Sequence, residues 1–200
     1  FFKMQWYSKQ QGEFQEEIIL SIVEMLSIHD EYTTNHSQKV AQLASRLGEE
    51  MGLSRKEIKD CYWSGLIHDI GKTLIPARIL NKKGPLTKDE YEQIKKHPVW
   101  GYQTIKKSSR LQELAEYVLY HHENWDGSGY PTGLEKEEIP LISQILQVSD
   151  SWDAMTSDRS YREALTRGEA VAELKENSGT QFAPEVVKAM LKLIVTQEVK

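Results

Sequence analysis

The segment HHENWDGSGYPTG, residues 121–133, is the most informative stretch of the chain. The segment begins with a histidine pair. Apolar residues at helical spacing precede this pair, namely Leu111, Leu114, Ala115 and Val118. Glycine and proline then interrupt regular structure from about residue 123 to 140. A loop of that length in a compact domain is usually functional or disordered, and its position behind the histidine pair favours function.

Helical periodicity extends from this loop in both directions and predicts an all-α bundle. Residues 14–26 and about 35–51 each carry an apolar stripe, and Gly52 is expected to stop the second helix. Capping boxes predict three further helix starts, at Ser54 with Glu57, Thr87 with Glu90, and Thr166 with Glu169. We expect Pro98 to end the helix that begins at Thr87, and Pro184 to begin the last helix.

Composition narrows the class of protein. The 200 residues are 39% hydrophobic and 28% charged, which is typical of one soluble globular domain, and they hold no apolar run long enough to span a bilayer. The single cysteine, Cys61, excludes an internal disulfide framework and fits a reducing cytoplasm. A net charge of −5 argues against binding of a nucleic acid polymer. A small anionic substrate stays compatible with that charge, because bound divalent cations would reverse the local field.

Two motifs hold candidate metal ligands. His68-Asp69 places an imidazole beside a carboxylate that could bridge two cations, although the pair alone also fits a helix C-terminus with Gly71 as its stop. His121 and His122 would point about 100° apart on a helix, so they reach one metal only at a helix end or a distorted turn. A surface histidine pair is the alternative.

Three further candidates are weaker when taken one at a time. His36 and His97 each fit an ordinary buried or surface histidine. Asp150 lies on an apolar helix with Asp153 one turn further on, and an unpaired buried carboxylate would be very costly there. A helix cap or a pair with an arginine would also explain Asp150.

Taken together, the candidates form one set of seven nitrogen and oxygen ligands without a thiolate: His36, His68, Asp69, His97, His121, His122 and Asp150. Seven side chains are too many for one tetrahedral zinc ion. They suit two octahedral divalent cations, with iron or manganese ahead of magnesium.

The order of these motifs resembles the HD superfamily of metal phosphohydrolases: His36, then HDIGK at 68–72, then His97 with Gly101. The segment 121–133 and DSWDAMTSDRSYR at 150–162 resemble its HD-GYP subfamily, and the likeness covers roughly residues 32 to 190. It implies an HD-domain helical bundle with a glycine-rich GYP loop, in a cytoplasmic bacterial enzyme. The implied reaction is hydrolysis of cyclic di-GMP to linear pGpG, and in some members to GMP, by a hydroxide that bridges the metals.

The resemblance also implies roles for individual residues. The first metal would bind His36, His68, Asp69 and Asp150, and the second would bind His97, His121, His122 and the shared Asp69. Asp69 and Lys72 would serve catalysis, while Lys72, Arg159 and Arg162 would contact substrate phosphates. Tyr32 replaces the glutamate that binds a third metal in some members, so we expect two metals. Ala183 replaces an aspartate N-cap, at a cost of about 1 kcal/mol.

The GYP loop has two readings. Tyr130 or Trp125 would stack on a guanine, or both would pin the loop to the body of the domain. The resemblance further implies contact with diguanylate cyclase domains through this loop.

Alternatives to the main reading include hydrolysis of another cyclic dinucleotide such as 3′,3′-cGAMP, a catalytically silent sensor, and a metal-free interaction bundle. Residues 1–31 are expected to form an N-terminal helix that links an upstream sensor or receiver domain to the phosphodiesterase domain at 32–200. The apolar stripe at 14–26 fits a homodimer and fits packing onto the same chain equally well.

Overall fold

The structure is a computed structural model that describes residues 21, 33–109, 111–158 and 163–196. Its α-helices are α2 (Thr33–Glu50), α3 (Arg55–Ile67), α4 (Ala77–Leu80), α5 (Lys88–Ile94), α6 (His97–Ile105), α7 (Ala115–Leu119), α8 (Leu141–Thr156), α9 (Arg167–Glu176) and α10 (Pro184–Val195). Short 3-10 helices are η1 (Ile70–Leu74), η2 (Gln112–Leu114) and η3 (Lys136–Glu138). Within these residues the only β pairing consists of two isolated bridges, so the all-α prediction is confirmed. The expected N-terminal helix lies outside the described residues, apart from Ser21.

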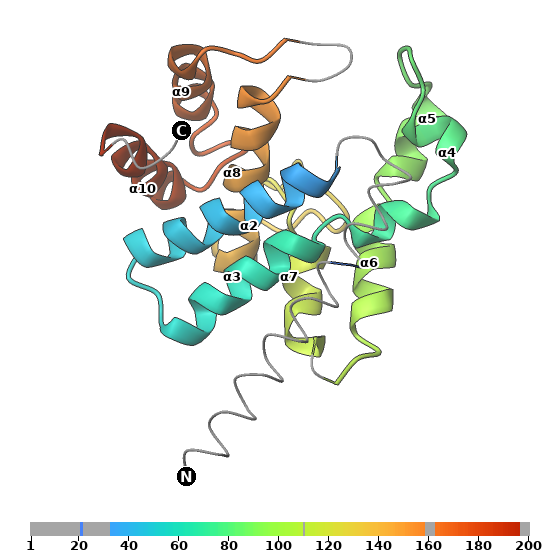
Figure 1. Cartoon of the computed structure of the whole chain (residues 1–200), viewed down its shortest axis with the longest axis horizontal. Coiled ribbons are helices and arrows are strands. Elements are labelled where there is room, and N and C mark those ends of the chain that lie inside the picture. Colours follow the sequence, from blue (N-terminus) through green and yellow to red (C-terminus); the bar gives the residue numbers. More distant parts are fainter. Residues whose placement is uncertain (1–20, 22–32, 110, 159–162, 197–200) are drawn as a thin grey trace.

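Helices α2 and α8 form the centre of the bundle (Figure 1). Helices α3 and α8 pack against α2, α9 and α10 lie together on one side, and α4, α5 and α6 lie on the other. The larger core cluster joins α2, α8, α9 and α10 through residues such as Leu47, Leu146, Leu174 and Met190. A second cluster joins α3, α6 and α7 to Ala41 of α2. None of the helices in the described ranges combines the length and apolar character that a bilayer span requires.

Glycine sets the close approach of α2 and α3. A Cβ atom on Gly65 would lie 2.6 Å from the Cα atom of Ala41, which is far inside van der Waals contact. The crossing point falls three residues before the C-cap of α3, His68. The absence of a side chain at Gly65 therefore lets the end of α3 approach α2 closely.

Local helix boundaries follow the sequence with two corrections. All three capping boxes are present, at Ser54, Thr87 and Thr166, and α10 begins at Pro184 as expected. The expectation that Pro98 ends a helix is wrong: α5 already ends at Ile94, and Pro98 lies in the first turn of α6. Proline fits there because the first helical N–H groups have no intrahelical partner.

Gly71 does not stop a helix either. It lies within η1, and a Cβ atom there would lie 2.0 Å from the carbonyl oxygen of His97. Gly71 therefore serves the close approach of η1 to the first turn of α6. Gly52, in contrast, follows α2 with a φ of +74° and serves as the expected stop.

Candidate metal centre

The structure brings all seven candidate ligands to one place between α2, the end of α3, α6 and α8. His36 lies near the start of α2, His97 is the first residue of α6, and Asp150 lies on α8. The remaining four follow helix ends: His68 and Asp69 after α3, and His121 and His122 after α7. All are buried except His122 and Asp150, which are partly exposed.

The His36 cluster consists of His36, His68, Asp69 and Asp150. The Nε2 atom of His36 lies 3.2 Å from Oδ1 of Asp150 and 4.0 Å from Oδ2 of Asp69. The Nε2 atom of His68 lies 3.2 Å from the same Asp69 oxygen. Two imidazole nitrogens and two carboxylates therefore face one small volume, and the ligand atoms of His36, His68 and Asp69 all lie within 4.8 Å of one another.

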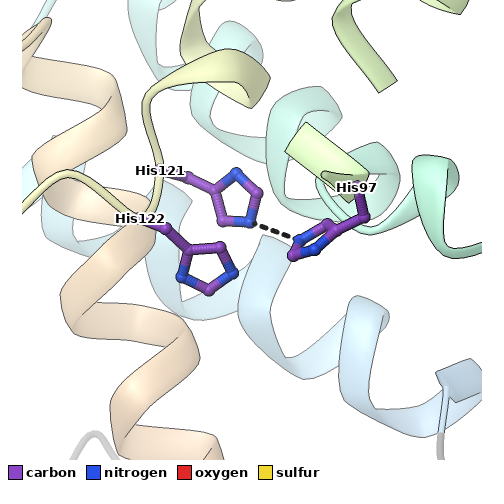
Figure 2. Close-up of side chains that lie close together, drawn as sticks. All are labelled: His97, His121 and His122. Carbon is purple, nitrogen blue, oxygen red and sulfur yellow. Dashed lines mark hydrogen bonds between the residues drawn. The ribbon is translucent and has the colours of Figure 1, made fainter. Parts of the chain in front are cut away.

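The His97 cluster consists of His97, His121 and His122, whose rings converge in Figure 2. The Nδ1 atoms of His97 and His121 lie 2.8 and 2.6 Å from the carbonyl oxygens of Ile94 and Val118. A carbonyl oxygen only accepts hydrogen bonds, so each Nδ1 atom carries a proton and donates. The Nε2 atoms of these two rings lie 3.4 Å apart. In neutral rings both Nε2 atoms present a lone pair, and a shared cation satisfies that arrangement.

Burial keeps two of these rings neutral. It lowers the pKa of His121 well below its ordinary value, and the charges of neighbouring histidines add to the effect. Burial likewise lowers the pKa of His122 to about 3, again with the support of His97. The neutral imidazole is the form that binds metal, so these rings hold their lone pairs available at neutral pH.

Asp69 belongs to the His36 cluster but also faces the His97 cluster. Its Oδ2 atom contacts His68, whereas its Oδ1 atom lies 3.3 Å from Nε2 of His97. Burial favours the neutral form of Asp69, but the charges of His68 and Lys72 outweigh it and hold the pKa of this carboxyl well below its usual range. The Lys72 ammonium group donates a hydrogen bond of 2.6 Å to Oδ2. One ionised carboxylate thus presents an oxygen to each cluster.

His36 is protonated differently from His121 and His122. Burial lowers the pKa of His36, but hydrogen bonds with Asp150 and Asp153 outweigh it and raise the pKa to about 9. Burial favours the neutral form of Asp150, yet His36 holds the pKa of Asp150 below its usual range. A cation that binds Nε2 of His36 must therefore displace a proton, so binding at this cluster weakens as the pH falls.

The donor set fits divalent cations. Two buried side-chain atoms at the centre, Nε2 of His68 and Oδ1 of Asp69, lie 3.2 and 3.3 Å from Oδ2 of Asp69 and Nε2 of His97, but neither contact has the geometry of a hydrogen bond. Leaving such groups unpaired costs about 1–3 kcal/mol each. Both atoms are good metal ligands, and both face the ligand groups already described. Nitrogen and oxygen donors without sulfur suit first-row cations such as iron or manganese.

The GYP loop is fastened to the centre by Glu123. This buried carboxylate accepts hydrogen bonds from the amide and the hydroxyl of Thr132, both 2.7 Å long, and from the amide of Gly133. The Tyr130 ring stacks on His122 with 4.9 Å between centroids. Trp125 packs against the larger core cluster, which supports the anchoring role for this residue. One face of the Tyr130 ring therefore lies against His122, a candidate metal ligand.

Three residues singled out in the sequence lie outside the described residues, and one residue has a contact that the sequence did not indicate. The three are Arg159, Arg162 and Tyr32. The sequence indicates only that Asp153 lies one turn after Asp150, whereas in the structure its carboxylate contacts Nδ1 of His36 at 2.7 Å. That contact joins positions 117 residues apart in the sequence, so helical spacing alone could not indicate it.

The fold and the site together define a helical bundle with a largely buried histidine–aspartate cluster that could hold divalent cations. The HD domain family matches residues 21–186 of the chain, so the chain belongs to this family. This family assignment confirms the HD resemblance, and its metal-dependent chemistry agrees with the donor set.

Two curated relatives and one solved structure give the closer context. The chain is 42% identical, over 184 residues, to a cyclic di-GMP phosphodiesterase of Thermotoga maritima, covering 89% of this chain and 50% of that protein. It is 33% identical, over 181 residues, to the 3′3′-cGAMP-specific phosphodiesterase 2 of Vibrio cholerae, covering 90% of this chain and 35% of that protein. The chain thus spans half or less of the length of these relatives.

Its fold is similar to that of a crystal structure of a cyclic GMP-AMP specific phosphodiesterase from V. cholerae, with a TM-score of 0.72. The two chains share 19% identity over 91% of this chain and 49% of the other. This likeness bears on the fold.

Proposed function

We propose that the chain is a metal-dependent phosphodiesterase that hydrolyses cyclic di-GMP to linear pGpG, with GMP as the alternative final product. The observation that carries the proposal is the position of Asp69, with one oxygen toward each of two histidine clusters. The similarity to a cyclic di-GMP phosphodiesterase across nine-tenths of the chain supports the choice of substrate.

We propose one cation in each cluster, with iron or manganese as the metal. His36, His68, Asp69 and Asp150 would hold the first, and His97, His121, His122 and Asp69 the second. When bound, the two cations would supply Lewis-acid charge and an acidified water for attack on phosphorus. The chain's own part is to fix the ligand rings through their Nδ1 hydrogen bonds and to keep the centre largely out of contact with solvent.

Lys72 is proposed to act on the substrate. Its ammonium group lies beside Asp69 and is about a quarter exposed, so it can meet a phosphoryl oxygen that approaches the centre. We propose the same role for Arg159 and Arg162, because arginine binds phosphate oxygens bidentately. We propose that the Tyr130 ring stacks on a base, which would replace the Lys95 ammonium group that lies 5.7 Å from the ring centroid.

A second substrate has one specific support. The relative of V. cholerae acts on 3′3′-cGAMP, and a cation centre that recognises the phosphodiester would serve both substrates. We therefore keep 3′,3′-cGAMP as the alternative substrate, to be compared in the same assay.

The domain arrangement is also a proposal. Since the relatives are about twice as long as the chain or longer, we infer that residues 1–31 connect residues 32–200 to a regulatory domain. A homodimer through the stripe at 14–26 and contact of the GYP loop with a diguanylate cyclase domain are further proposals from the sequence.

The test is an anaerobic assay with iron(II) or manganese(II), in which cyclic di-GMP and 3′,3′-cGAMP are incubated separately with wild type and Asp69→Ala. Products are resolved by chromatography. We expect linear dinucleotide or GMP from wild type alone, with cyclic di-GMP consumed faster. Asp89→Ala, which changes an exposed aspartate of α5, is the matched control and should keep full activity. Equal turnover by Asp69→Ala would refute the proposed centre.

A further inference from the structure

The Nδ1 atoms of the ligand rings do not all have the same kind of partner. In His68, His97 and His121 the Nδ1 atom hydrogen-bonds a backbone carbonyl three residues earlier in the chain, at 2.6–2.8 Å. In His36 the partner is a carboxylate, Oδ2 of Asp153, at 2.7 Å. A carbonyl is a neutral acceptor, whereas a carboxylate carries a full charge and makes a stronger bond.

Asp153 is itself held in place. It is 5% exposed, and its second oxygen, Oδ1, accepts a hydrogen bond of 3.0 Å from the Ser157 hydroxyl. The Lys39 ammonium group lies 3.4 Å from the same oxygen. Asp153 thus has one oxygen fixed by Ser157 and Lys39, which leaves the other directed at His36.

Two carboxylates of helix α8 contact the His36 ring, one at each nitrogen. Asp150 and Asp153 lie one turn apart on α8, so their side chains share a face. The Oδ1 atom of Asp150 lies 3.2 Å from Nε2 of His36, while Oδ2 of Asp153 lies 2.7 Å from Nδ1. Asp153 therefore fixes the ring orientation that points Nε2 toward the His36 cluster.

We propose that Asp153 is the positioning residue for the His36 cluster and strengthens cation binding there once the proton of His36 is displaced. This inference rests on the proposed function only for the presence of cations. A carboxylate on the far nitrogen of a ligand histidine fixes its tautomer and raises its basicity as a ligand. The rings of His97 and His121 receive the weaker support of a neutral carbonyl. Cation binding at the His36 cluster thus depends on Asp153, whereas binding at the His97 cluster does not.

The test uses the whole chain, stripped of metal and titrated with manganese(II). Free ion is followed by electron paramagnetic resonance, which also separates an isolated ion from an exchange-coupled pair. The variants are Asp153→Asn, which keeps the shape and removes the charge, and Asp158→Asn. Asp153 and Asp158 line one pocket of about 420 Å³, together with residues such as His36, so Asp158 is a matched control.

We expect Asp153→Asn to weaken one of the two binding steps by roughly 10–100-fold, the usual effect of removing such a partner. The other step should change by less than about threefold, and the coupled-pair signal should give way to that of an isolated ion at low loading. Asp158→Asn should match wild type in both steps. Equal weakening of both steps, or no weakening, by Asp153→Asn would overturn the proposal.

Two further measurements keep the result interpretable. Circular dichroism of the metal-free variants checks that helix content is unchanged. If Asp153→Asn fails to fold, Ser157→Ala replaces it, because it removes one support of Asp153 without touching His36. Ser157→Ala should weaken the same single step several-fold, and no change there would also overturn the inference. A wild type that binds no manganese would refute the proposed function as well, whereas two bound ions with an unaltered Asp153→Asn would refute the inference alone.

Discussion

Replacement of Glu123 by glutamine should cost far more stability than its small change in shape suggests. The buried carboxylate accepts three donors: the amide and hydroxyl of Thr132 and the amide of Gly133. Glutamine keeps one acceptor oxygen but turns the other into an NH₂ group that faces the Gly133 amide. A hydrogen bond to a charged group contributes about 1.5–3 kcal/mol, against about 0.5–1.5 kcal/mol for a neutral one. Three bonds that each lose roughly 1 kcal/mol predict a loss of about 2–4 kcal/mol.

Urea unfolding of the metal-free chain measures this loss directly, because the midpoint moves while the slope stays constant. The control is Glu137→Gln, an exposed glutamate in the same stretch of chain, which should stay within about 0.5 kcal/mol of wild type. If Glu123→Gln were as stable as this control, the carboxylate would not hold the loop, and the account of how the loop is fastened would be wrong.

Three other outcomes follow from packing, burial and ligand binding. Gly65→Ala should destabilise the chain by about 1–3 kcal/mol, because the added Cβ would clash with α2. Gly168→Ala should not destabilise it, because the space around that Cβ is open. Equal melting temperatures of the two variants would contradict this prediction. Burial raises the pKa of Cys61 to about 12, above its value in the unfolded chain. The neutral thiol therefore favours folding below about pH 9, and this contribution is lost as the pH rises toward 12. In urea unfolding, Cys61→Ala should lose less of its free energy of unfolding over that pH range than wild type. Each bound cation should raise stability by about 2.7 kcal/mol at a free concentration of one hundred times its Kd, and a chelator should reverse the shift in a thermal melt.

The sequence predicted the parts of the fold that depend on neighbouring residues. Capping boxes at Ser54, Thr87 and Thr166 are local arrangements, so the identity of four consecutive residues decides them. Pro98 shows the limit of this reasoning, because proline is compatible with the residue after one helix and with the first turn of the next. The choice between the two depended on where α5 ended, and α5 has no buried residue to set its length.

The site was predicted as a set of residues but not as a geometry. Motif order named the seven candidates, and the structure brings them together. The position of Asp69 between two clusters depends on the close crossings at Gly65 and Gly71, whose neighbours lie far away in sequence. The hydrogen bond from His36 to Asp153 likewise joins α2 to α8. Contacts of this kind come from packing of the whole bundle, so no local pattern reveals them.

The central claim is that cations held by the two clusters enable the chain to hydrolyse a cyclic dinucleotide. The most direct measurement is the rate of cyclic di-GMP hydrolysis by metal-free protein, under anaerobic conditions, as manganese(II) is added stepwise. We predict no turnover without metal and a rate that levels off at two ions per chain. Turnover by the metal-free chain at the metal-replete rate would contradict the claim, as would a rate that levels off at a single ion.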